Sequence, residues 1–288
     1  MAQLAPSRCD GRVFDQVAAE YDRNRPAYPD ALVDRACGVA GIASGDPVLE
    51  AGCGTGQLTR SLLARGLRVT AVEPGEQLMS LAEQNLAGRG EVQFVNARFE
   101  DAELPRAQYR AAFSASAFHW IDPDVSWQKA ARLLAPDGTL ALIQYCGLDE
   151  RGTPDDQRAL LSAMARIVPE LGDVWPAYRN LGSIGAGVEQ RRENVSEAWS
   201  WIGRYDLARA DARRLFCDVQ LATVPIVVEH TADELTGLLR TLSFYSRLSP
   251  DQRHALESEH TEMYERLGRP FRSSTAAVLI TARRRADV

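Results

Sequence analysis

A glycine-rich segment follows a short apolar run near residue 50. Residues 48–51 are apolar apart from Glu50, and residues 52–56 then read Gly-Cys-Gly-Thr-Gly. Glycine tolerates positive φ and lets the backbone approach a ligand closely, so this pattern is typical of a nucleotide-binding turn between a strand and a helix. A dinucleotide site would have glycine or alanine at position 57, where this chain has Gln57. The acidic Glu50 before the loop favours a cationic ligand over a pyrophosphate.

A second acidic residue lies one predicted crossover helix further along the chain. Residues 68–73 predict a strand that ends at Glu73, and Pro74 follows it. A carboxylate at the end of the second strand can accept hydrogen bonds from both hydroxyls of a ribose. The alternative interpretation is that Glu73 only caps the next helix. Together, the two features favour a nucleoside with a cationic group over a dinucleotide.

These segments resemble the class I S-adenosylmethionine-dependent methyltransferases, and in particular their bacterial small-molecule, type 11-like group. Residues 14–29, Phe-Asp-x-Val-Ala-x-x-Tyr-Asp-x-x-Arg-Pro-x-Tyr-Pro, resemble the N-terminal lid of that group. Residues 114–120, which end in His-Trp, resemble the segment after its fourth strand. The resemblance covers about residues 14–145. It implies S-adenosylmethionine as cofactor, S-adenosylhomocysteine as product, and methyl transfer by in-line displacement.

The resemblance places the cofactor against the lid, the glycine loop and the ends of the first four strands. The residues implied are Tyr21, Arg25, Glu50, Gly52, Cys53, Gly54, Gly56, Glu73, Pro74, Met79, Arg98, Phe99, Glu100 and Ser114. Arg98 takes the position where the family usually has an acid, so Glu100 is expected to bind the adenine amine. Tyr21 is expected to cover the sulfonium. Arg25 is expected to pair with the methionine carboxylate, although it could equally be a surface residue.

Two residues are candidates for the chemistry itself, namely His119 and, through the lid, Tyr21. His119 follows a strand end, and an ordinary imidazole can exchange a proton near neutral pH. The alternative is that His119 and Trp120 pack under the cofactor and shape the pocket. The remaining histidines, His230, His254 and His260, are expected to be solvated.

Between residues 47 and 145, strands of about five residues alternate with helices of about ten. This alternation predicts a parallel sheet with right-handed crossovers. With the resemblance, the expected fold is α/β: a Rossmann-like, seven-stranded, mostly parallel sheet with helices on both faces, a helical cap insertion and an N-terminal lid helix. The expected units are a lid (1–30), a cofactor-binding core (31–146), a helical cap (147–222), and the last strands and helix, which complete the core (223–288).

The composition and charge of the chain disfavour nucleic acid, metal and membrane as partners. The net charge is -6, and a dedicated nucleic-acid binder would normally present a basic face. The five cysteines lack ligand or disulfide spacing, which favours a reducing cytoplasm and argues against a structural metal. The sequence shows no signal peptide and no apolar stretch of about 20 residues. We therefore expect neither export nor a membrane-spanning helix.

The expected function is metal-free methyl transfer to a small molecule. The expected acceptor is a bulky, partly apolar specialised metabolite. Aromatic side chains of the insertion either line the acceptor pocket or form the insertion's own core; they are Trp175, Tyr178, Trp199, Trp201 and Tyr205. The alternatives are a methyltransferase of RNA or protein, and a fold relative that binds the cofactor but catalyses a non-methylating rearrangement. The accepting atom and the oligomeric state stay open, and a homo-oligomer is possible.

Overall fold

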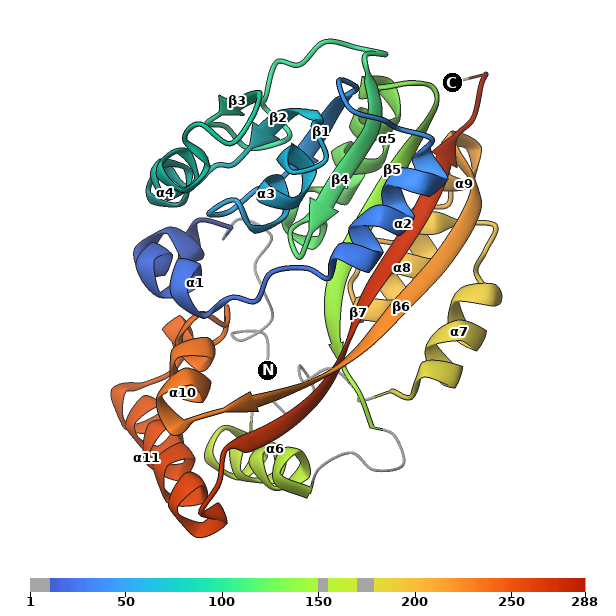
Figure 1. Cartoon of the computed structure of the whole chain (residues 1–288). Helices are drawn as coiled ribbons and strands as arrows, with labels where there is room; N and C mark the ends of the chain where they lie inside the picture. Colours follow the sequence, from blue (N-terminus) through green and yellow to red (C-terminus); the bar gives the residue numbers. More distant parts are fainter. Residues whose placement is uncertain (1–10, 150–154, 170–178, 288) are drawn as a thin grey trace.

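One seven-stranded sheet runs through the computed structural model, which describes residues 11–149, 155–169 and 179–287 (Figure 1). The strand order is β3-β2-β1-β4-β5-β7-β6. The strands are β1 (Pro47–Ala51), β2 (Arg68–Val72), β3 (Val92–Val95), β4 (Tyr109–Ala115), β5 (Leu134–Gly147), β6 (Phe216–His230) and β7 (Phe271–Arg284). The first five are parallel, and β7 is antiparallel to both of its neighbours. The prediction of a Rossmann-like, mostly parallel sheet is confirmed.

Both faces of the sheet are buried, which is why the parallel strands are apolar on consecutive residues. In β1, the neighbours Val48 and Leu49 are both fully buried but belong to separate apolar cores. The core that contains Val48 includes side chains of α2 (Asp30–Ala40), α3 (Gln57–Leu63) and α4 (Glu76–Leu86). The core that contains Leu49 includes side chains of α5 (Pro123–Leu133) and of later helices.

The segment between β5 and β6 carries α6 (Asp155–Ile167), α7 (Leu181–Glu189), α8 (Val195–Gly203) and α9 (Ala212–Leu215). The expected helical character therefore ends at Leu215, and the prediction of helix up to residue 222 is wrong for its last residues. Residues 216–222 belong to β6, which pairs with β7 from Phe216↔Arg284 onward. The segment alternates in side-chain exposure, as a strand does.

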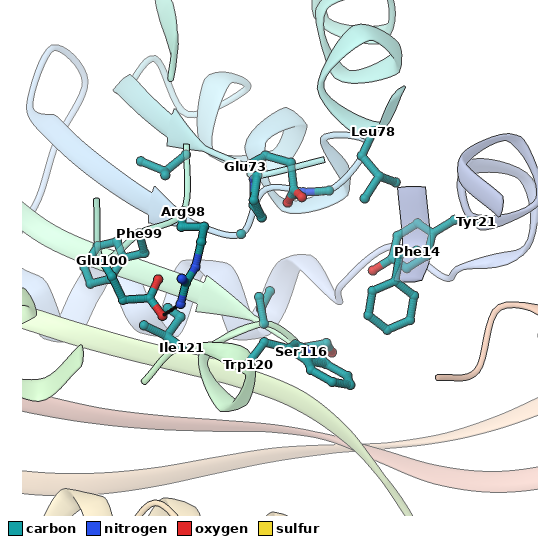
Figure 2. Close-up of a pocket in the computed structure, with 16 residues that line it drawn as sticks. Phe14, Tyr21, Glu73, Leu78, Arg98, Phe99, Glu100, Ser116, Trp120 and Ile121 are labelled. Carbon is teal, nitrogen blue, oxygen red and sulfur yellow. Dashed lines mark hydrogen bonds and ion pairs between the residues drawn. The ribbon is translucent and has the colours of Figure 1, made fainter. Parts of the chain in front are cut away.

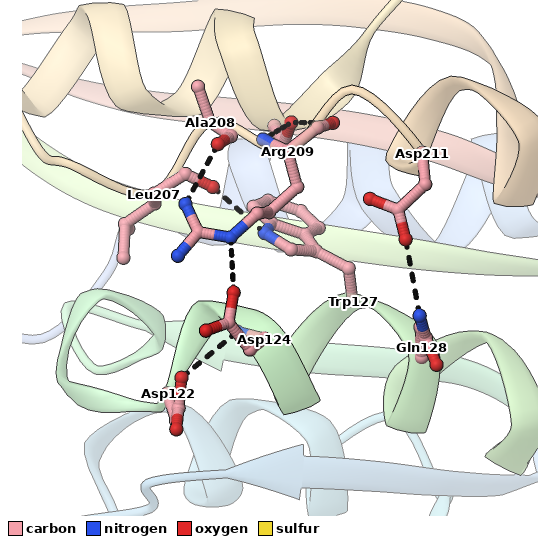
Figure 3. A network of polar contacts seen from close by, with 9 residues as sticks. Asp122, Asp124, Trp127, Gln128, Leu207, Ala208, Arg209 and Asp211 are labelled. Carbon is pink, nitrogen blue, oxygen red and sulfur yellow. Dashed lines mark hydrogen bonds and ion pairs between the residues drawn. The ribbon is translucent and has the colours of Figure 1, made fainter.

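The turn after α8 is fixed to α5 by three side-chain hydrogen bonds (Figure 3). Trp127 donates its indole N–H to the Leu207 carbonyl at 3.1 Å. Arg209 Nε donates to an Asp124 carboxylate oxygen at 2.6 Å, and Gln128 reaches Asp211 at 3.1 Å. These bonds hold the α7–α9 part of the insertion against the helix that follows β4.

Strands β6 and β7 continue beyond the rest of the sheet and end at α10 (Ala232–Arg240) and α11 (Pro250–Leu267) (Figure 1). These two helices and α6 share a small apolar core of their own, which includes Met164, Leu239 and Leu256. Ser249 caps the first turn of α11, and Gly268 ends this helix at a φ of 60°.

The N-terminal lid consists of a 3₁₀ helix (Gly11–Val17) followed by α1 (Ala18–Asn24). Asp15 accepts hydrogen bonds from the backbone N–H groups of Gln77 and Leu78 at 2.7 and 3.0 Å, at the start of α4. On its other side, α1 contacts α10. The lid is thus held between α4 and the extension formed by β6, β7, α10 and α11.

Candidate cofactor and active site

An open pocket lies at the carboxyl ends of β1, β2 and β4, where ligands collect in open α/β sheets (Figure 2). Its walls come from the lid, the glycine loop and the segments after β2, β3 and β4. The lining residues are Phe14, Tyr21, Gly52, Gly54, Val72, Glu73, Pro74, Leu78, Arg98, Phe99, Glu100, Ala115, Ser116, Ala117, Trp120 and Ile121. Eight of the residues expected from the sequence line it; they are Tyr21, Gly52, Gly54, Glu73, Pro74, Arg98, Phe99 and Glu100.

The glycine loop adopts backbone conformations that side chains strongly disfavour. Gly52, Gly54 and Gly56 have φ values of 77°, 57° and 93°. A Cβ on Gly52 would lie 2.3 Å from Cβ of Ala117, the lining residue on the opposite segment. The loop is held to β2, because Gly52 N and Cys53 N both donate to the Val72 carbonyl. This cradle brings bare backbone to the pocket wall.

Glu73 is fixed by the loop that it faces. One carboxylate oxygen accepts from Gly54 N and the other from Gly75 N, each at 3.0 Å. Burial raises the pKa of Glu73 to about 6, although both backbone hydrogen bonds act to lower it. Each oxygen of an ionised carboxylate can accept a second hydrogen bond. The preformed carboxylate can therefore still take the two hydroxyls of a ribose.

The segment after β3 forms the opposite wall. Arg98 Nη2 and Asp122 N both donate to the same Glu100 carboxylate oxygen, at 2.9 and 3.0 Å. Phe99 is buried, and the Lys129 ammonium lies 5.5 Å from the centre of its ring. Glu100 thus retains acceptor capacity beside an aromatic ring, as an adenine site requires.

Three aromatic rings close the lid side of the pocket. Phe14 makes edge contacts with Tyr21 and with Trp120, at centroid distances of 5.6 and 5.4 Å. Burial raises the pKa of Tyr21, so its phenol keeps its proton. Aromatic faces stabilise a nearby cation, which suits the sulfonium expected here.

Arg25 lies behind these rings and does not line the pocket. Its guanidinium carbon is 5.1 Å from the Tyr21 ring centre, and Nη2 donates to the Thr241 carbonyl at 2.6 Å. Arg25 Nε is buried and has no hydrogen-bond partner among the described residues. The alternative of an exposed surface residue does not fit, since Arg25 is half-buried between the lid and α10, and its expected pairing with the methionine carboxylate stays a prediction.

Several expected cofactor contacts lie behind the pocket wall. Glu50 is buried and accepts from the Thr59 hydroxyl at 2.7 Å. Ser114 donates to the Ala51 carbonyl and so ties β4 to β1. Met79 packs into the core under α4, whereas its neighbour Leu78 lines the pocket. Cys53 and Gly56 are likewise outside the lining and shape the loop.

The lining also contains residues that the sequence reasoning did not single out as cofactor contacts. They are Phe14, Val72, Leu78, Ala115, Ser116, Ala117, Trp120 and Ile121. Most of them belong to the motif segments named above, so their position in those segments could have identified them as pocket residues. Ile121 and Leu78 carry no such signal, since any apolar side chain could stand at either place.

His119 does not line the pocket but lies beside it, next to Trp120. Its ring stacks on Tyr205 at 4.4 Å and an interplanar angle of 5°, and the Tyr205 hydroxyl donates to Gln144 Oε1 at 2.7 Å. Burial and the charge of Arg25 lower the pKa of His119 to about 3. The imidazole is therefore neutral at physiological pH, and its Nδ1 is buried without a partner among the described residues.

The structure gives different outcomes for the insertion aromatics and for the remaining histidines. Trp199 is fully buried in the core, and only Tyr205 of the insertion aromatics reaches His119 among the described residues. Trp175 and Tyr178 lie outside the described residues. His260 is buried against Thr236, so the prediction that it is solvated is wrong. Burial lowers the pKa of His260 to about 4.

The buried carboxyl of Glu50 makes the ligand-free protein sensitive to pH. Burial raises its pKa from 4.5 to about 8, so the folded state holds this proton more tightly than the unfolded chain. Stability is consequently lost as pH rises from about 4.5 to about 8. We expect Glu50→Gln to lie close to the wild type in stability near pH 5 and to be more stable by about 4 kcal/mol near pH 9, the difference that a pKa raised from 4.5 to about 8 implies. Urea unfolding at both pH values measures this.

The exposed Glu83 of α4 provides a matched control for that prediction, because Glu83→Gln removes the same charge at the surface. It should leave the difference between the two pH values unchanged. Equal pH dependence of Glu50→Gln and the wild type would contradict the assignment.

Two further properties of residues 11–149, 155–169 and 179–287 concern membranes and metal ions. Within those ranges, every helix is either too short or too polar to span a lipid bilayer. The same residues contain no grouping of three His, Cys, Asp or Glu side chains arranged to hold a metal ion.

Residues 49–142 match the family described as "Methyltransferase domain". An uncharacterized methyltransferase of Mycobacterium tuberculosis is 29% identical over 160 residues, which cover 56% of this chain and 60% of that protein. A demethylmenaquinone methyltransferase of Clavibacter sepedonicus is 27% identical over 70% of this chain and 84% of that protein. The chain thus spans about 60% of the length of the mycobacterial relative.

A solved structure of a putative type II methyltransferase from Anaeromyxobacter dehalogenans has a TM-score of 0.59 and 24% identity, over 90% of this chain and 97% of that one. It shares the fold. With the strand order, the glycine cradle and the placement of Glu73, these findings define the class of protein. The chain therefore carries a methyltransferase domain, at residues 49–142, within a Rossmann-like fold that it shares with solved methyltransferase structures.

Proposed function

We propose that this chain binds S-adenosylmethionine in the pocket at the ends of β1, β2 and β4 and transfers its methyl group to a small, bulky, partly apolar acceptor. The observation that carries the proposal is the convergence of three features on one pocket. Gly52 and Gly54 of the glycine cradle line this pocket, as do the Glu73 carboxylate and the aromatic lid residues Phe14 and Tyr21.

The residues present fit this cofactor. The carboxylate of Glu73 suits the ribose hydroxyls, and Glu100 with Phe99 suits the adenine. Tyr21 and its aromatic neighbours suit the cationic sulfur. Arg25, whose Nε lacks a partner among the described residues, suits the methionine carboxylate after a small movement of its side chain. When bound, the cofactor supplies an electrophilic methyl group on a sulfonium.

The chain's contribution to the transfer is mainly orientation and exclusion of water. A displacement of this kind gains most from holding the acceptor in line with the methyl group. The lid is held on α4 by Asp15 and on α10 by Arg25, so it closes the pocket from one side. The neutral phenol of Tyr21 introduces no charge that would compete with the cation.

We assign His119 a positioning role, because a pKa of about 3 makes its imidazole a weak base. We expect His119→Asn to lower the transfer rate by less than about 10-fold, whereas loss of a general base typically costs about 100-fold or more. The rate should also show no ionisation of this group between about pH 5 and 9 in either protein. A pH–rate profile that loses a limb in the variant would contradict the assignment.

The proposal is tested in two stages with the purified chain. Calorimetry first measures S-adenosylhomocysteine binding. S-adenosylmethionine with a labelled methyl group is then incubated with matched series of hydroxylated, aminated and carboxylated aromatic compounds, and labelled products are identified by mass spectrometry. Cofactor binding with no labelled product in any series would favour the alternative of a non-methylating catalyst. Absence of cofactor binding would reject the proposal.

The cellular setting is part of the proposal. The described cysteines, Cys37, Cys53, Cys146 and Cys217, are unpaired, which supports a reducing compartment such as the cytoplasm. A specialised metabolite is the proposed acceptor class, because the insertion places the aromatic ring of Tyr205 against His119, which borders the cofactor pocket.

A further inference from the structure

A stacked cation lies in the insertion, beyond the cofactor pocket. The guanidinium carbon of Arg179 is 3.6 Å from the ring centre of Trp201, and that of Arg191 is 5.1 Å from the same ring. Arg179 Nη1 is buried and has no hydrogen-bond partner among the described residues. Burying a cation without a partner is costly, so an unpaired guanidinium N–H points to a missing anion.

The charged neighbours of Arg179 supply no such anion. Burial and the positive charges of Arg204 and Arg191 act to lower the pKa of Arg179, and the thiol of Cys146 acts to raise it. Arg191 itself donates to the backbone carbonyl of Gly187 at 2.9 Å. No described carboxylate forms an ion pair with Arg179 or with Arg191.

The position of Arg179 connects it to the transfer site. Arg179 N approaches the Gly147 carbonyl at 3.5 Å, at the carboxyl end of β5. Strand β4 ends where Ala115 pairs with Ile143, so β5 continues for four residues from there to Gly147. At about 3.3 Å per residue, this extension is about 13 Å long.

Polar side chains occupy the interval between His119 and Arg179. The Tyr205 hydroxyl donates to Gln144 Oε1 at 2.7 Å, and Gln144 Nε2 lies 3.6 Å from the sulfur of Cys146. Cys146 in turn interacts electrostatically with Arg179. The polar side chains of Tyr205, Gln144 and Cys146 therefore lead from His119 toward Arg179.

We propose that Arg179, assisted by Arg191, is an anchoring subsite for a carboxylate on the acceptor, about 13 Å along β5 from the end of β4. A guanidinium stacked on an indole keeps its N–H edge free for a planar, bidentate carboxylate. The carboxylate is the anchor and not the methylated atom. The inference rests on the proposed function, since it concerns the acceptor of that reaction.

The test compares two matched probes, 2-naphthoate and 2-naphthamide, which differ in charge but hardly in shape. Calorimetry measures their dissociation constants with the chain saturated with S-adenosylhomocysteine. The wild type is expected to bind the carboxylate at least about 10-fold more tightly than the amide, which corresponds to about 1.4 kcal/mol. Arg179→Leu is expected to abolish that preference, and Arg179→Lys to retain part of it.

Arg192→Leu serves as the control, because Arg192 is an exposed arginine next to Arg191 that pairs with Glu189. It should leave the preference unchanged. Binding of S-adenosylhomocysteine to each variant shows that the cofactor pocket is intact, and its failure in the wild type would count against the proposed function instead. Equal binding of the two probes, no binding of the carboxylate, or an unchanged preference in Arg179→Leu would overturn the subsite.

Discussion

Replacing Glu73 by alanine is expected to weaken S-adenosylhomocysteine binding about 100-fold. The carboxylate is buried and already aimed by its hydrogen bonds from Gly54 N and Gly75 N, so no side-chain ordering has to accompany binding. Hydrogen bonds to a charged group contribute about 1.5–3 kcal/mol each. Loss of two, partly offset by water in the variant, corresponds to about 3 kcal/mol, or roughly two orders of magnitude in the dissociation constant measured by calorimetry.

The same change removes the partner of two backbone N–H groups, so its effect on folding has to be separated. A urea unfolding curve of Glu73→Ala gives the stability loss, and Glu83→Ala on the exposed face of α4 gives the effect of losing one surface charge. Affinity in the wild type should also fall below about pH 6, where the carboxyl takes up a proton and loses acceptor capacity. An unchanged affinity in folded Glu73→Ala would remove the ribose assignment.

The parallel half of the fold followed from local patterns, because each strand there is buried on both faces and each crossover has a clear helical period. The C-terminal half followed less well. Residues 216–222 alternate in exposure because they form part of an edge strand. Such an alternation is a weak sequence pattern, and the helical pattern directly before it made these residues look helical as well. Residues 136–138, Pro-Asp-Gly, lie inside β5, where Asp137 has a φ of 60° and the pairing with β4 shifts register between Tyr109 and Ala111.

The site shows the same division between local and tertiary information. Residues whose role depends on backbone geometry or on a strand end, such as Gly52 and Glu73, could be found from spacing. The choice between Met79 and Leu78 could not, because adjacent residues of a helix differ in direction by about 100° and the helix orientation is a tertiary property. Arg179 is further from prediction, since its stack on Trp201 joins the segment before α7 to α8.

For Glu50, the role predicted from the motif differs from the position that the side chain has in the structure. Its acidic character suggested contact with a cationic ligand, yet the carboxyl is buried behind the loop and bonded to Thr59. At that place its charge acts on the pocket through space. The raised pKa of about 8 implies that a cationic ligand, by favouring the ionised form, would make the site release a proton on binding.

Gly52→Ala is expected to destabilise the protein by about 3 kcal/mol or more and to abolish cofactor binding. Two costs add at this position. A φ of 77° is strained for alanine by about 1–2 kcal/mol, and the new methyl group would lie 2.3 Å from Cβ of Ala117. Relief of that clash typically costs another 1–3 kcal/mol, and it has to move either the loop or the segment after β4. Both line the pocket.

Gly41→Ala separates these two costs, because Gly41 has a similar φ of 60° at the end of α2 but no atom within 4 Å of its added Cβ. It should lose only the backbone contribution, about 1 kcal/mol, and keep wild-type affinity. The difference between the two variants in urea unfolding thus measures the clash between the glycine loop and Ala117. If Gly52→Ala matched Gly41→Ala in both stability and affinity, the close approach of those segments would not be what shapes the pocket.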